Sequence, residues 1–188
     1  MTVTIGRLMA KSEISMERTT LRKIIEKLRA IYLGPIGWEY NFIGNDEVRK
    51  WFFQKVENEY YTYNPGRDEK KRILAKLNEA VVFENFLHTK FLGQKRFSIE
   101  GGENTIPALQ TIINRAADLD VKEVVIGMAH RGRLNVLSNI MGKSYEAIFS
   151  EFEGHVDPNT VQGSGDVKYH LGATGKYASP TGAVIPIE

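Results

Sequence analysis

The fold class of this chain is decided by Val121-Lys122-Glu123-Val124-Val125-Ile126-Gly127-Met128, a stretch that is apolar and mostly β-branched apart from two charged residues. Such a stretch is typical of a buried strand, because parallel strands covered on both faces carry near-continuous apolar runs. A helix is expected on each side. Thr105 can cap the preceding helix, whose first turn holds Pro107, and the following helix covers 133–141. The helix–strand–helix order predicts an α/β fold with a parallel sheet.

Two further elements are expected toward the C-terminus. A helix begins at Ser144, carries Glu146 in its first turn and ends before Gly154. The alternating stretch 183–188 predicts a strand. The chain ends on this strand, so we expect the α/β domain to be incomplete.

The first half of the chain is predicted to be helical. Apolar residues recur at helical spacing from Leu21 to Tyr32, with Thr19 or Thr20 as the cap and Gly34-Pro35 as the stop. Three more helices are expected: one from Asn45 or Asp46 with Val48, Trp51, Phe52, Val56 and Tyr60 inward, one over 68–77, and one from Asn78 to Phe91. The predicted organisation is a flexible leader (1–19), a helical segment (20–92) and a partial α/β domain (93–188).

Composition excludes several classes of function. The 188 residues carry 25 basic and 23 acidic side chains, a net charge of +2, which is too balanced to predict nucleic-acid binding. No apolar run approaches the ~20 residues that span a bilayer, so no membrane partner is expected. The chain has no cysteine, which excludes disulfides, cysteine-ligated zinc and thiol nucleophiles.

The strongest candidate site is the loop 127–135, which follows the predicted strand. Ligands of open α/β sheets bind beyond the carboxyl ends of the strands. Arg131 or Arg133 could bind a phosphate or carboxylate through a forked pair of hydrogen bonds, and His130 could donate to an oxyanion or move a proton near neutral pH. The alternative is a capped loop whose histidine binds a carbonyl and whose arginines pair with surface acids. Spacing alone leaves both readings open.

Other polar residues are weaker candidates. His170 follows Lys168-Tyr169, but an isolated histidine of this kind is more often structural, and His88 and His155 are weaker still. Arg96, near a glycine pair, could form an anion nest or an ion pair that fixes the junction of the two halves; the structural role is favoured. The sequence contains no Gly-rich nucleotide motif, no nucleophile elbow and no His-Glu-x-x-His zinc motif.

Four sequence blocks occur in one order and register. They are Gly34-Pro35-Ile36-Gly37-Trp38-Glu39-Tyr40, Leu92-Gly93-Gln94-Lys95-Arg96-Phe97-Ser98-Ile99-Glu100-Gly101, Gly127-Met128-Ala129-His130-Arg131-Gly132-Arg133-Leu134-Asn135-Val136-Leu137, and Gly165-Asp166-Val167-Lys168-Tyr169-His170-Leu171-Gly172. Together they resemble the hallmark blocks of the 2-oxoglutarate dehydrogenase E1 family, over roughly residues 20–188. Several long blocks in register are far more specific than one short motif.

The resemblance implies a function. The family's E1 enzymes bind thiamine diphosphate and Mg²⁺ at a homodimer interface, and the cofactor is the electron sink for loss of CO₂ from 2-oxoglutarate. The succinyl unit then passes to the lipoyl group of E2, dihydrolipoyl succinyltransferase, in the tricarboxylic acid cycle. His130 and His170 resemble the catalytic, substrate-binding histidines, and Arg131 resembles a cofactor-binding arginine.

The chain also departs from the family pattern. Gly165-Asp166 is followed by Val167, so it is not the Gly-Asp-Gly start of the usual cofactor motif. The metal ligands have no counterparts in the chain, and we expect the chain alone to be inactive. A related enzyme for 2-oxoadipate and a non-catalytic partner-binding module remain alternatives. A cytoplasmic location is expected, or the mitochondrial matrix in a eukaryote.

Overall fold

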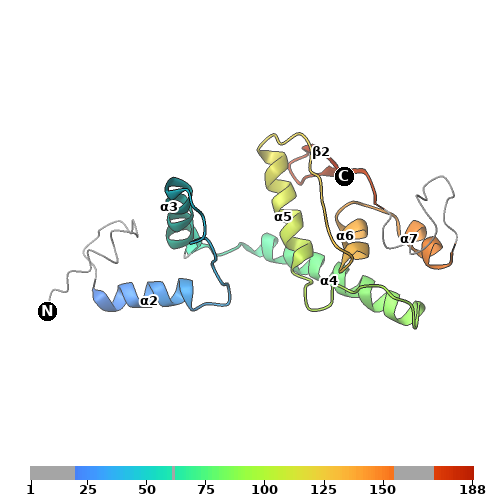
Figure 1. The fold of residues 1–188 in the computed structure, drawn as a ribbon, viewed down its shortest axis with the longest axis horizontal. Coiled ribbons are helices and arrows are strands. Elements are labelled where there is room, and N and C mark those ends of the chain that lie inside the picture. The colour runs from blue at the N-terminus through green and yellow to red at the C-terminus, as the bar shows by residue number, and fades with distance from the viewer. Residues whose placement is uncertain (1–19, 61, 155–171) are drawn as a thin grey trace. The chain divides into compact units, whose positions relative to one another are not determined.

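The structure, a computed structural model, describes residues 20–60, 62–154 and 172–188. They belong to two compact units, one up to Pro65 and one from Gly66 (Figure 1). The helices expected between residues 20 and 92 are therefore divided between the two units. Helices predominate, and the strands of the described residues form one small sheet.

The first unit holds helix α2 (Leu21–Tyr32), helix α3 (Asp46–Gln54) and the π-helix η1 (Lys55–Tyr60). The predicted caps are confirmed: the Thr20 side chain accepts from the Lys23 amide, and Asn45 accepts from the amides of the first turn of α3. The predicted inward face of the second helix is partly wrong, because Trp51 is 52% exposed. The change to π geometry at Lys55 interrupts the α-helical period on which that face was predicted.

A tyrosine pair satisfies a buried carboxylate in this unit. Glu57 in η1 is buried, and its Oε1 accepts a hydrogen bond of 2.8 Å from the Tyr32 hydroxyl. The Tyr32 and Tyr40 hydroxyl oxygens lie 2.8 Å apart. Burial, followed by the hydrogen bonds to Tyr40 and Glu57, raises the pKa of Tyr32 well above its usual range. Burial also raises the pKa of Tyr40.

These shifts predict a loss of stability at alkaline pH. A phenol whose pKa is higher in the folded state keeps its proton there while the unfolded chain loses it, so the stabilisation is complete below about pH 10 and falls as the pH rises further. Both tryptophans, Trp38 and Trp51, lie in the first unit, so urea unfolding followed by tryptophan fluorescence reports on it. The urea concentration at which half of the protein is unfolded should decrease as the pH is raised above 10. The urea midpoint of Tyr32→Phe should be lower than that of the unaltered protein at pH 7 and should decrease less at alkaline pH. If both midpoints decreased equally with pH, the assignment to Tyr32 would be contradicted.

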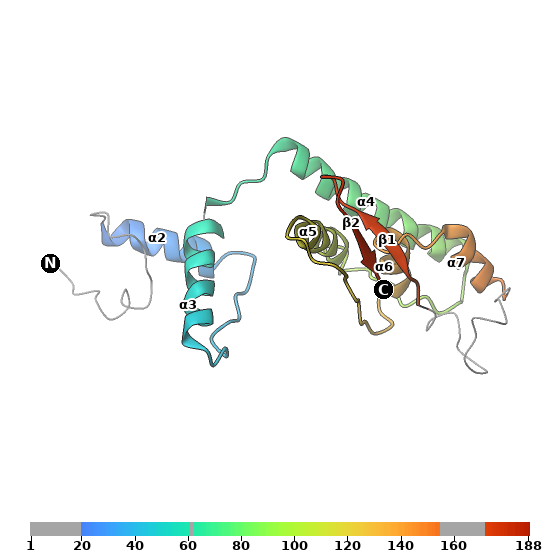
Figure 2. The ribbon, with the colours of Figure 1, turned by 90° about the horizontal axis from the view of Figure 1, so that it is seen from above.

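The second unit is built on one long helix, α4 (Arg67–Lys90). The expected break near Asn78 is wrong: no glycine or proline interrupts 67–90, and Asn78 is exposed, where an asparagine is tolerated inside a helix. Helices α5 (Thr105–Asp118), α6 (Arg133–Asn139) and α7 (Tyr145–Phe152) follow one another along α4 (Figures 1 and 2). The predicted cap of α7 is confirmed, since Ser144 accepts from the Ala147 amide.

The sheet differs from the prediction. Strands β1 (Gly175–Ala178) and β2 (Val184–Ile187) pair antiparallel. The predicted buried strand 121–128 makes only an isolated parallel bridge, between Val124 and Ile187. Val125 is 70% exposed, so the strand is not covered on both faces in this chain. The predicted terminal strand is confirmed as β2, whose side chains alternate between exposed and buried.

Two apolar clusters hold the second unit together. The first cluster joins α4, α5, the α6 region and β2 through Ala80, Ile106, Ile113, Leu137, Ile185 and Ile187. The second joins α4, α6 and α7 through Phe83, Leu87, Phe91, Leu134, Ile148 and Phe152. Helix α6 contributes to both, so the loop that precedes it is anchored on a well-packed element.

Candidate active site

The strongest candidate loop, residues 127–135, follows the extended segment 121–128 and leads into α6. His130 and Arg131 are both exposed at its tip. On its strand side, Val124 and Ile126 donate backbone hydrogen bonds to Pro186 and Glu188. On its helix side, the buried side chains of α6 follow directly. The loop is therefore anchored at both ends and presents an imidazole and a guanidinium outward.

A second loop, residues 97–99, lies against the first. The rings of Phe97 and His130 are 4.2 Å apart between centroids and tilted by 46°. The Arg131 guanidinium donates to the Ser98 carbonyl at 3.2 Å, and the Gly132 amide donates to the Phe97 carbonyl at 2.7 Å. Three consecutive residues of the candidate loop are thus held by one neighbouring segment that is about thirty residues earlier in the chain.

Gly132 is the residue at which this contact is closest. Its φ is +73°, in the left-handed region that favours glycine. A Cβ built there would lie 2.8 Å from Cγ1 of Ile99. The glycine therefore serves two needs, the turn into α6 and the close approach of the 97–99 segment.

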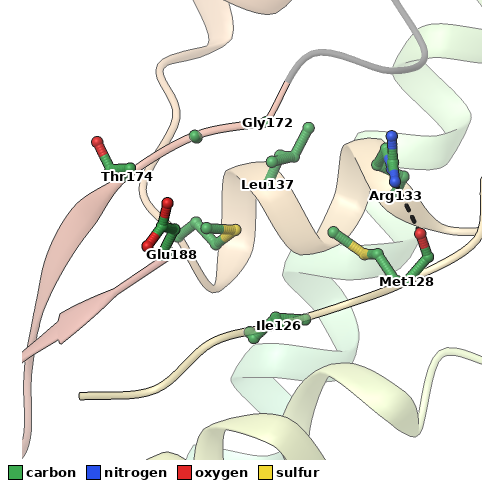
Figure 3. A pocket seen from close by; sticks show the side chains of 9 residues that line it. Ile126, Met128, Arg133, Leu137, Gly172, Thr174 and Glu188 are labelled. Atoms are coloured by element: carbon green, nitrogen blue, oxygen red, sulfur yellow. Dashed lines mark hydrogen bonds between the residues drawn. The ribbon is translucent and has the colours of Figure 1, made fainter.

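Arg133 turns back rather than outward. Its Nη2 donates to the Met128 carbonyl at 2.7 Å, so the guanidinium spans the loop (Figure 3). It lines a cavity of about 420 Å³ together with apolar side chains that include Ile126, Met128 and Leu137. The two arginines therefore differ. Arg133 holds a carbonyl of its own loop, as a structural residue would, whereas Arg131 lies exposed where a ligand could reach it.

A larger cavity adjoins Arg131. It has a volume of about 590 Å³. Apolar side chains of the 99–109 region, the strand segment and α6 line it, together with the glycines 101, 102 and 127 and the polar side chains of Glu100 and Thr105. Arg131 is the cationic residue of this lining. An apolar wall with one guanidinium suits a ligand that is part ring and part anion, and the Glu100 carboxylate is the one acidic side chain of this lining.

Among the other predicted residues, His88 and Arg96 do not line this cavity. His170 and His155 fall outside the described residues. His88 is exposed on α4 and lines a small cavity of about 140 Å³ with Arg96 and Glu84. Within the described part of the chain, the Arg96 Nε is buried without a hydrogen-bond partner and no ion pair of Arg96 forms, so the structural role favoured for Arg96 stays a prediction.

Sequence reasoning missed Glu84, and it gave no role to Asn135, the last residue of the candidate loop. Asn135 is fully buried and Glu84 is 8% exposed. Both fall at helical spacing among apolar residues. Only their interruption of the inward faces of α4 and α6 could have marked them, since a polar residue on such a face needs a buried partner.

Two absences apply to the described residues only. No group of three histidine, aspartate or glutamate side chains there could hold a metal ion. Among the same residues, no helix combines the length and the apolar character that crossing a bilayer requires.

Comparison with known proteins identifies the family. The model of the dehydrogenase E1 component family matches residues 75–187. A multifunctional 2-oxoglutarate metabolism enzyme of Mycolicibacterium vanbaalenii is 52% identical over 157 residues, which cover 84% of this chain and 12% of that protein. The 2-oxoglutarate dehydrogenase E1/E2 component of Corynebacterium glutamicum is 50% identical over 161 residues, 86% of this chain and 13% of that protein. The chain thus spans about an eighth of the length of these relatives, and it belongs to the dehydrogenase E1 component family.

Proposed function

We propose that this chain forms part of the active site of a 2-oxoglutarate dehydrogenase E1 enzyme, which decarboxylates 2-oxoglutarate and transfers the succinyl unit to the lipoyl group of an E2 partner. The observation that carries the proposal is the pair His130 and Arg131, exposed on one anchored loop beside a cavity of about 590 Å³. The names of the two relatives support the choice of 2-oxoglutarate. Because the chain covers so little of their length, the activity is assigned to a longer polypeptide.

Arg131 and the apolar wall of the cavity support thiamine diphosphate as its ligand, with the diphosphate on the Arg131 side and away from the Glu100 carboxylate. Arg131 supplies a cation for a phosphate group, and the apolar wall formed by Ile99, Leu109 and Ile126 accommodates an aromatic ring. When bound, this cofactor supplies an electron sink for the loss of CO₂. The proposal includes Mg²⁺, with its ligands outside this chain, and a homodimer in the complete enzyme.

His130 and Arg131 have separate tasks in this proposal. Arg131 binds an anionic group and orients it, while its bond to the Ser98 carbonyl limits its own freedom. His130 donates an imidazole N–H to the 2-oxo oxygen of the substrate, where negative charge develops. His170 acts as a second donor to the substrate. The parallel bridge between Val124 and Ile187 supports a parallel sheet that is completed by the longer polypeptide. The proposal also includes a cytoplasmic location.

The test is an activity measurement on the polypeptide encoded by the complete reading frame that contains this chain. CO₂ release is measured with added thiamine diphosphate and Mg²⁺, using 2-oxoglutarate, 2-oxoadipate and pyruvate in parallel. The proposal expects the highest kcat/KM with 2-oxoglutarate and dependence on the cofactor. A preference for 2-oxoadipate would move the assignment to that substrate. No CO₂ from any 2-oxo acid, or a reading frame that stops at codon 188, would overturn it.

A further inference from the structure

We propose that Glu84, a buried residue of α4, is a positioning residue for His130 and Arg131. The inference rests on the proposed function and adds a residue that no motif marked. One buried carboxylate oxygen joins the two elements between which the His130 loop is held.

The first element is the 97–99 segment. Oε1 of Glu84 accepts a hydrogen bond of 3.2 Å from the Ile99 amide. Ile99 itself is buried, and its side chain fills the space beside Gly132. The carboxylate therefore holds the backbone of the 97–99 segment and keeps the Ile99 side chain buried. The carbonyls of the same segment accept hydrogen bonds from Arg131 and Gly132.

The second element is α6. The same Oε1 accepts from Nδ2 of Asn135 at 3.2 Å, and this nitrogen also donates to the Ala80 carbonyl at 3.0 Å. The Asn135 Oδ1 accepts from Nδ2 of Asn139 at 2.7 Å. Asn135 stands in the first turn of α6, so the network ties the start of this helix to α4.

Because this hydrogen-bond network is buried, its loss should displace the segment that places His130 and Arg131. Both Glu84 and Asn135 are at least nine-tenths buried, so the loss of a partner leaves a buried polar group at a cost in free energy. His130 and Arg131, in contrast, are exposed and receive their placement from the 97–99 segment through the Phe97 ring and the Ser98 carbonyl. A displacement of about 1 Å at a reacting group can cost on the order of 100-fold in rate.

The test uses three variants in the complete polypeptide. Glu84→Met keeps the side-chain length but removes the acceptor, and Glu84→Gln keeps an acceptor oxygen. Glu79→Met on the same helix is the matched control, because Glu79 pairs with Lys76 away from the loop. Glu84→Met should lower kcat and kcat/KM together by about 10- to 100-fold, as expected when an interaction of the transition state is lost. Glu84→Gln should stay within about threefold, and Glu79→Met should change neither constant.

Two further measurements test the inference, and the second does not depend on the folding of Glu84→Met. Hydrogen exchange at the Ile99 amide should be slow in the unaltered protein and in Glu84→Gln, and faster in Glu84→Met. Phe97→Leu, which removes the ring beside His130 but leaves the buried network, should lower kcat with unchanged exchange at Ile99.

The outcomes separate the two proposals. An unaltered polypeptide without activity on 2-oxoglutarate overturns the proposed function and with it this role. An active polypeptide in which Glu84→Met speeds exchange at Ile99 but keeps kcat shows a purely structural network and overturns the positioning role alone. Unchanged kcat in Phe97→Leu overturns it as well, since the segment would then not place His130.

Discussion

Replacing His130 with alanine is expected to lower kcat for CO₂ release from 2-oxoglutarate by about 100-fold or more in the complete polypeptide. The imidazole is exposed at the tip of a loop that is anchored on both sides, so its removal takes away a hydrogen-bond donor without opening the core. Stability should change little for the same reason. The steady-state rate and the urea midpoint, measured on one preparation, check both expectations.

A matched control is available in the same unit. His88 is also an exposed histidine, but it lies on α4 away from the large cavity. His88→Ala should keep kcat and KM within about twofold, within the range of ordinary surface substitutions. If His130→Ala retained the rate of His88→Ala, the catalytic assignment of His130 would be refuted, whereas a rise in KM at constant kcat would leave it only a binding role.

The helices of this chain could largely be predicted from sequence because their signals are local. Thr20, Asn45 and Ser144 cap the helices that they were expected to cap, since a side-chain acceptor next to free amides acts within one turn. The break at Asn78 failed because an exposed asparagine does not stop a helix without a proline or glycine beside it.

The strand 121–128 shows what local signals cannot decide. Its composition is that of a buried strand, but burial of Val125 requires neighbouring elements, and the described residues offer one parallel bridge. The candidate site likewise depends on contacts between segments that are far apart in the chain. The sequence could predict that the loop carries His130 and Arg131, but not that residues 97–99 hold it, because contacts across about thirty residues leave no periodic pattern.

Gly132→Ala is expected to cause the largest loss of stability among single substitutions in the loop, about 3 kcal/mol. Two costs add at this position. The left-handed backbone, with φ of +73°, penalises any side chain, and the new Cβ would meet Cγ1 of Ile99 at 2.8 Å. Ile99 cannot move away cheaply, because it is buried and its amide is bonded to Glu84.

Gly142→Ala separates the two costs. Gly142 has nearly the same φ, +76°, but no heavy atom lies within 4 Å of a Cβ built there, so only the backbone penalty of about 1–2 kcal/mol applies. Urea unfolding followed by circular dichroism should therefore place Gly132→Ala well below Gly142→Ala. Adding Ile99→Val removes Cδ1, 2.9 Å from the new Cβ, and should recover about 0.5 kcal/mol or more as a coupling energy. Equal losses in the two glycine variants, with no coupling to Ile99, would mean that the 97–99 segment yields to the added methyl group and does not hold the His130 loop rigidly.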